Sequence, residues 1–205
     1  MKALVRKDLL ETFTAMRTIF LIMAVFAAAA ALAEGCGFYI PYLVILPGVL
    51  GTTLINLDTR EKWDIYALTL PVNRRTVITS RYVYTLIMLL DGTLLGTVCF
   101  LIRYARGFES GGVLSAMTLC FAGGLVTPAV GLPLAYKFGP DKGRYAMMFL
   151  LIGIMFAAMS VFHDGFAPSD ALAAFPVWAT LPAALALFAA SWAVSAAIYE
   201  KKEIA

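Results

Sequence analysis

Long, continuous apolar runs limit what this chain can fold into more than any other feature of its sequence. A helix needs about 20 mostly apolar residues to cross the roughly 30 Å hydrocarbon core of a bilayer. Six runs approach or reach this length, and they predict membrane spans at 15–33, 39–57, 82–102, 113–135, 145–162 and 176–198. The runs are continuous and do not alternate, which favours helices over barrel strands. We therefore expect an all-α integral membrane protein with six transmembrane helices.

Composition leads to the same class. The chain is 61% hydrophobic and 14% charged, whereas soluble domains are about 25% charged. The six runs fill most of the chain, so residues 1–205 are expected to form a single transmembrane domain.

Residues 1–17 carry apolar side chains at helical spacing, with charges largely elsewhere on the wheel, which predicts an interfacial amphipathic helix. A plain extension of the first span is the alternative, and in either case we expect that span to be retained.

The positive charges predict the orientation of the chain. Of the 16 Lys and Arg residues, all but Arg103 and Arg106 fall in segments expected on one side of the membrane. Because cytoplasmic segments are enriched in Lys and Arg, we expect both termini and the 58–81 loop to be cytoplasmic. The net charge of +3 is explained by this bias and indicates no nucleic-acid partner.

The sequence offers little chemistry for an enzyme. It contains no phosphate-binding loop of the Gly-x-x-x-x-Gly-Lys-Ser/Thr type. A single histidine, His163, and three cysteines without a metal-binding spacing provide no metal site. We therefore expect no catalytic residue, no metal and no cofactor in this chain itself.

Asp91 is the one clear ionisable residue within a predicted span. A charge there costs at least about 2.5–3.5 kcal/mol on insertion scales, so Asp91 should face protein or water. It either lines a polar cavity or is protonated or hydrogen-bonded to a neighbouring helix, including one of a second copy. Gly92 and Gly96 follow at a spacing that lets helices approach closely. Together the three residues form a candidate cavity or interface.

The 58–81 loop is both charged and rich in apolar side chains. An aromatic and aliphatic anchor surrounded by charge is typical of a compact protein interface. The loop therefore indicates a docking surface for a cytoplasmic partner. The alternative is an ordinary interfacial loop with Trp63 and Tyr66 at the level of the lipid headgroups.

Two short stretches carry a resemblance to a known family. They are 61–75, which reads EKWDIYALTLPVNRR, and the N-terminal pattern of Leu4, Lys7, Asp8 and Leu9. Both resemble type-2 ATP-binding-cassette (ABC) transporter permeases, in which the first stretch is a cytoplasmic coupling helix between spans two and three. The chain is similar in size and layout to small bacterial members, including peptide-toxin exporters such as those of phenol-soluble modulins.

The resemblance implies a homodimer in the bacterial plasma membrane, with a separate ATPase subunit that binds ATP and Mg. The N-terminal helix would add a second contact with the ATPase through Lys7 or Asp8. The implied cargo is hydrophobic or amphipathic. The residues expected to dock on the ATPase are Trp63, Asp64, Tyr66, Leu68, Leu70, Pro71 and Arg74. Two alternatives stay open, a proton-coupled carrier that uses Asp91 and a membrane scaffold that does not transport.

Overall fold

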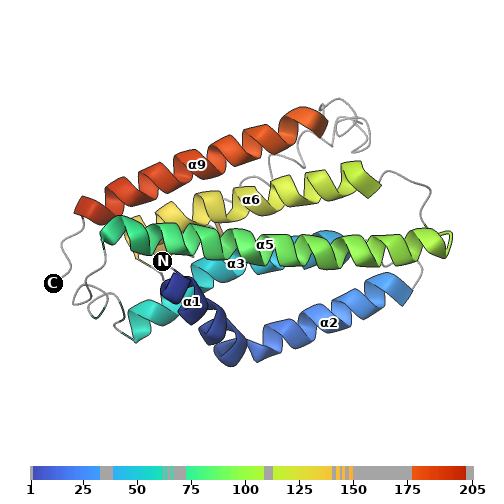
Figure 1. Ribbon diagram of the computed structural model, residues 1–205, viewed down its shortest axis with the longest axis horizontal. Helices are drawn as coiled ribbons and strands as arrows, with labels where there is room; N and C mark the ends of the chain where they lie inside the picture. Colours follow the sequence, from blue (N-terminus) through green and yellow to red (C-terminus); the bar gives the residue numbers. More distant parts are fainter. Residues whose placement is uncertain are drawn as a thin grey trace.

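The part of the chain that the structure describes is helical. The computed structural model describes residues 2–32, 39–61, 63, 66, 73–108, 113–139, 142, 143, 145, 148, 149 and 177–201. Its helices are α1 (Lys2–Ala15), α2 (Arg17–Leu32), α3 (Tyr39–Arg60), α5 (Arg74–Ala105), α6 (Val113–Phe138) and α9 (Val177–Lys201) (Figure 1). These residues include no strand. The predicted all-α class is confirmed.

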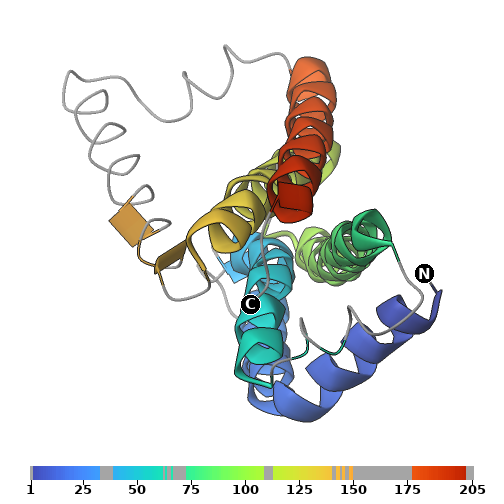
Figure 2. The same cartoon turned by 90° about the vertical axis from the view of Figure 1, so that its left-hand side faces the viewer.

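α2, α3, α5, α6 and α9 run roughly along the long axis of the molecule, and α1 lies across α3 and α5 at one end (Figures 1 and 2). Three segments are each long and apolar enough to span a membrane, namely Tyr39–Arg60, Arg74–Ala105 and Ala179–Tyr199. α1 and α2 together provide a fourth candidate, bent by 75° at their junction. The number of six spans stays a prediction, because 145–162 lies almost entirely outside the described residues.

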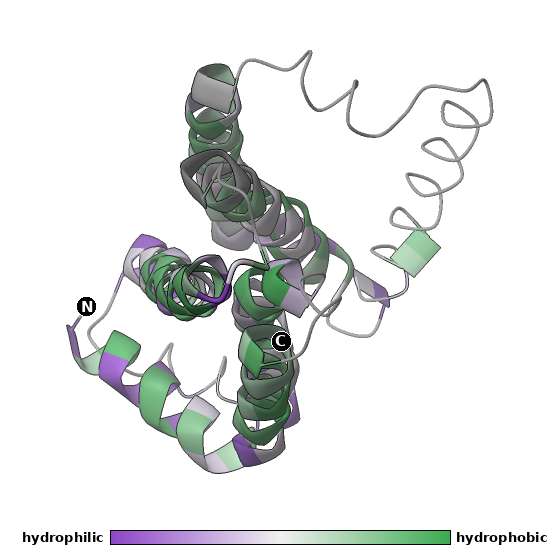
Figure 3. Ribbon diagram, turned by 90° about the vertical axis from the view of Figure 1, so that its right-hand side faces the viewer, coloured by the Kyte–Doolittle hydropathy of each residue, from purple (hydrophilic) through white to green (hydrophobic). Residues whose placement is uncertain are grey.

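α1 packs on the bundle through one narrow face. Its buried residues are Leu4, Asp8 and Thr12, which recur at intervals of four and so share a side of the helix. Hydrophilic and hydrophobic residues alternate along the ribbon of α1 (Figure 3). α1 therefore presents a buried carboxylate, as well as apolar side chains, to the bundle.

Glycines bring α3 and α5 into close contact. A Cβ atom on Gly92 would lie 2.6 Å from the backbone oxygen of Leu43, a separation that real Cβ atoms do not adopt. A Cβ atom on Gly96 would lie 3.1 Å from Val44. The Gly-x-x-x-Gly spacing of α5 thus serves packing against α3 of the same chain.

A proline creates a polar link among α5, α6 and α9. Pro133 has no N–H group to donate to the carbonyl of Ala129, four residues earlier in α6. Ser191 of α9 donates to that carbonyl instead, at 2.5 Å. The Tyr82 hydroxyl of α5 lies 2.8 Å from the hydroxyls of both Ser191 and Ser195. The side chains thus satisfy a carbonyl that would otherwise be unpaired in an apolar setting.

α3 and α5 extend beyond the apolar runs that predict them, toward the segment that connects them. α3 continues to Arg60 and α5 begins at Arg74, so Asp58 and Arg81 are helical and do not lie in an irregular loop. At the opposite end, Arg103 donates to the carbonyl of Ala30 at 2.8 Å, and Arg106 donates to that of Leu32 at 3.2 Å. Cations near a helix C-terminus are favourable, so these two arginines fix the end of α2 against α5.

Candidate functional site

Five charged side chains meet where α1 crosses α3 and α5. Arg81 pairs with Asp58 through Nη2 and Oδ2, and its Nη1 lies 3.3 Å from Asp8 Oδ1. Lys7 Nζ lies 2.6 Å from Asp58 Oδ1 and 2.5 Å from Glu11 Oε2. Asp8, Asp58 and Arg81 are each less than 5% exposed. We call these five residues the ion cluster.

The ion cluster contains one carboxylate more than it contains cations. Burial raises the pKa of Asp8, the attraction of Arg81 and of Lys7 lowers it, and Glu11 raises it again. Burial is the largest of these effects, so the pKa of Asp8 is above its ordinary value. Asp8 Oδ2 has no hydrogen-bond partner among the described residues. Burial thus disfavours the charged form of Asp8 more than its two neighbouring cations favour it.

A neutral hydrogen bond and apolar side chains lie beside the ion cluster. The Thr12 hydroxyl donates to the carbonyl of Asp8 at 2.8 Å. Since a hydroxyl has one hydrogen, the Tyr84 hydroxyl must then donate to Thr12 Oγ1, at 2.6 Å. Tyr84 belongs to a buried apolar group with Leu50 and Leu54 of α3. These contacts join α1 to the same two helices that supply Asp58 and Arg81.

Lys7 also connects the ion cluster to the predicted docking segment. Its Nζ lies over the ring of Trp63, 4.3 Å from the centroid, a geometry in which a cation is attracted to an aromatic ring. The ring of Trp63 in turn lies 5.2 Å from that of Tyr66, centroid to centroid. Tyr66 is 56% exposed. An aromatic pair, half-buried at Trp63 and exposed at Tyr66, therefore lies next to buried charges on three helices.

Of the other predicted docking residues, the structure describes Arg74, which lies elsewhere. Arg74 opens α5 and lies at the end of α9, where its Nη1 donates to the carbonyl of Tyr199 at 3.4 Å. Asp64, Leu68, Leu70 and Pro71 lie outside the described residues.

Asp91 and the two glycines point in different directions from α5. Gly92 and Gly96 are buried against α3, whereas Asp91 is exposed. Leu90 and Leu94, beside Asp91 on the helix, are 57% and 66% exposed. The three residues predicted as one cavity or interface therefore do not form a single surface within this chain.

Sequence reasoning missed Asp58, Glu11 and Arg81 as site residues. It counted them only as charges of the loop or of the amphipathic helix. A usable signal was present, since each charge lies within about two turns of the end of an apolar run. Asp58 follows the second run directly and Arg81 directly precedes the third. Charges at the joined ends of adjacent spans are candidates for mutual pairing.

Comparison with protein families gives a match over most of the chain. The family described as "ABC-2 family transporter protein" matches residues 3–200. No curated protein and no solved structure matches the chain.

Proposed function

Because the chain belongs to the ABC-2 family of transporter proteins, which its match over residues 3–200 shows, we propose that it is the permease subunit of an ATP-driven exporter. A separate ATPase subunit binds and hydrolyses ATP with Mg, and this chain binds no nucleotide. Its cargo is hydrophobic or amphipathic, of the kind represented by amphipathic peptides. It acts as a homodimer in the bacterial plasma membrane, with both termini in the cytoplasm.

One observation carries the proposed docking role, namely the contact of Lys7 with Trp63 at the ion cluster. The exposed ring of Tyr66 and the half-buried ring of Trp63 form an aromatic surface, and aromatic residues dominate the energy of many interfaces. The ion cluster behind them joins α1, α3 and α5 through buried charges. A force applied at Trp63 therefore reaches three helices through short contacts.

The proposed mechanism follows from this arrangement. ATP closes the ATPase subunits on each other, and the docked segment around Trp63–Leu70 moves with them. Lys7 and the ion cluster carry this movement to α1 and to the ends of α3 and α5. The bundle then shifts between its inward-open and outward-open arrangements.

The test is co-purification of the chain with a candidate phosphate-loop ATPase subunit. We expect Trp63→Ala plus Tyr66→Ala to weaken the complex about 30-fold or more, since an interface hot spot contributes about 2 kcal/mol or more. Tyr42→Ala plus Tyr104→Ala is the matched control, because both tyrosines are exposed at the opposite end of the bundle. If the two double variants retain the ATPase equally, the docking assignment is wrong.

A proton-coupled carrier is a second candidate, favoured by the exposed position of Asp91 near the middle of α5. Under this alternative, Asp91→Asn abolishes transport, and collapse of the proton gradient stops transport while ATP remains. Under the exporter proposal, the same substitution alters transport only modestly, and ATP depletion stops it.

A further inference from the structure

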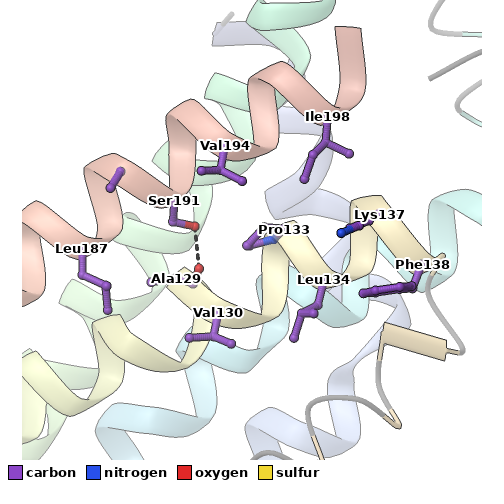
Figure 4. Close-up of a pocket in the computed structure, with 11 residues that line it drawn as sticks. Ala129, Val130, Pro133, Leu134, Lys137, Phe138, Leu187, Ser191, Val194 and Ile198 are labelled. Carbon is purple, nitrogen blue, oxygen red and sulfur yellow. Dashed lines mark hydrogen bonds between the residues drawn. The ribbon is translucent and has the colours of Figure 1, made fainter. Parts of the chain in front are cut away.

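A groove of about 490 Å³ lies between α6 and α9 (Figure 4). Most of its wall is apolar and includes Ala129, Pro133, Leu187, Val194 and Ile198. Its volume falls within the range of about 300–1,000 Å³ that is usual for sites of single small molecules. The groove is therefore large enough for one chain-like apolar ligand.

The polar groups of the groove lie in two places. The Ser191 hydroxyl is already used, because it donates to the carbonyl of Ala129. Among the described residues that line the groove, Lys137 is the charged one, and it is exposed near the end of α6. The groove thus pairs an apolar wall with a single cation at one end (Figure 4).

The length of the groove matches one leaflet of a bilayer. On α9 its wall extends from Leu187 to Ile198, which is about 16 Å at the helical rise of 1.5 Å per residue. Half of the roughly 30 Å hydrocarbon core of a membrane is about 15 Å. Ile198 and Lys137 lie at the same end, since Tyr136 and Tyr199 beside them are in ring contact. From Lys137, the groove therefore extends over about the thickness of one leaflet.

We propose that this groove binds one anionic phospholipid, with an acyl chain between α6 and α9 and the headgroup phosphate at Lys137. Charge complementarity favours an anionic headgroup over a zwitterionic one. Lys142 is exposed close by in sequence, and Arg144 follows it, against one acidic residue, Asp141. Each such cation attracts an anionic lipid surface by about 1 kcal/mol. The proposal does not depend on the transport function proposed above.

Native mass spectrometry of the full chain in detergent tests the proposal. The chain is titrated with phosphatidylglycerol and with phosphatidylcholine of the same acyl length. We expect one tightly retained phosphatidylglycerol and about five-fold weaker retention in Lys137→Gln, the ratio that corresponds to about 1 kcal/mol. Lys2→Gln is the charge-matched control, because Lys2 is exposed on α1 and does not line the groove. It should retain most of the binding.

Val194→Trp tests whether the acyl chain occupies the groove. The indole would fill the space between the helices, so retention of both lipids should fall, whereas Leu185→Trp on the same helix should leave it unchanged. Unfolding midpoints of the variants show that each remains folded. Equal lipid retention by Val194→Trp and Leu185→Trp would overturn the proposal. So would loss of the dimer instead of lipid in Val194→Trp, because the occupant would then be a second copy of the chain.

Discussion

Arg81 is the residue on which the charge balance of the ion cluster depends. It contacts Asp58 and Asp8, and all three side chains are buried. Removing one partner of a buried pair leaves an uncompensated charge, which costs about 3–5 kcal/mol. We therefore expect Arg81→Gln to lower the free energy of unfolding by roughly that amount, measured by chemical denaturation in detergent micelles.

Arg75→Gln is the control for this prediction. It makes the same change in charge in the first turn of the same helix, at an exposed position. Exposed substitutions of this kind usually change stability by less than about 0.5 kcal/mol. Equal stability of the two variants would show that the ion cluster does not stabilise the fold.

The contribution of Asp8 to the free energy of unfolding should decrease as pH rises. Its pKa is raised, mainly by burial, so the folded chain holds this proton more tightly than the unfolded chain does. The stabilisation from protonated Asp8 is complete below its unfolded pKa of about 3.9 and is lost as pH rises through its folded pKa. Asp8→Asn imitates the protonated form, so its stability relative to the wild type should increase from about pH 4 to about pH 7.

Asp58→Asn provides the contrast to Asp8→Asn. Asp58 receives contacts from both Lys7 and Arg81, so the neutral side chain should destabilise the protein at pH 7. Unfolding midpoints of the three proteins across this pH range check both expectations. If Asp8→Asn lost stability relative to the wild type as pH rose, ion pairing and not burial would dominate at Asp8.

At the scale of the helices, close packing of α3 on α5 predicts that alanine will destabilise the protein at Gly92 but not at Gly123. In Gly92→Ala the new methyl group would meet the backbone oxygen of Leu43, which cannot move aside cheaply. Overpacking of this kind typically costs about 1–3 kcal/mol. In Gly123→Ala the methyl group would meet nothing within 4 Å, so helix propensity should make that change neutral or slightly stabilising. Thermal unfolding in micelles compares the two, and similar losses in both would contradict close packing at Gly92.

The helices also show where sequence reasoning succeeds and where it stops. Apolar runs predict the all-α class, because only a hydrogen-bonded helix hides its backbone in hydrocarbon without a partner strand. They do not give the ends of α3 and α5, since a helix continues past the hydrocarbon when its charged side chains find partners, as Asp58 and Arg81 do. The spacing of Gly92 and Gly96 predicts a close approach but does not identify the partner. That partner is set by the shape of α3 around Leu43 and Val44.

On the scale of the whole molecule, α1 stands apart from the long helices and meets them near one end. It is bent by 75° from α2 and crosses the bundle there (Figure 1). The ion cluster and the pair of Thr12 with Tyr84 hold α1 to α3 and α5. Lys7 is the residue of α1 that also touches Trp63. Under the proposed docking role, a helix held in this way would transmit movement from the segment around Trp63 to α3 and α5.

Lys7→Gln should therefore separate binding of the proposed ATPase subunit from the transfer of its movement to the helical bundle. The substitution removes the cation from Trp63, Glu11 and Asp58 but leaves the aromatic docking surface in place. We expect the ATPase to bind with nearly unchanged affinity, while ATP turnover by the complex moves toward that of the isolated ATPase. Lys2→Gln, an exposed change on the same helix, should preserve wild-type turnover. If Lys7→Gln weakened binding as strongly as loss of Trp63 and Tyr66, Lys7 would be part of the docking surface. If its turnover matched that of Lys2→Gln, α1 would not lie on the path by which ATP drives the bundle.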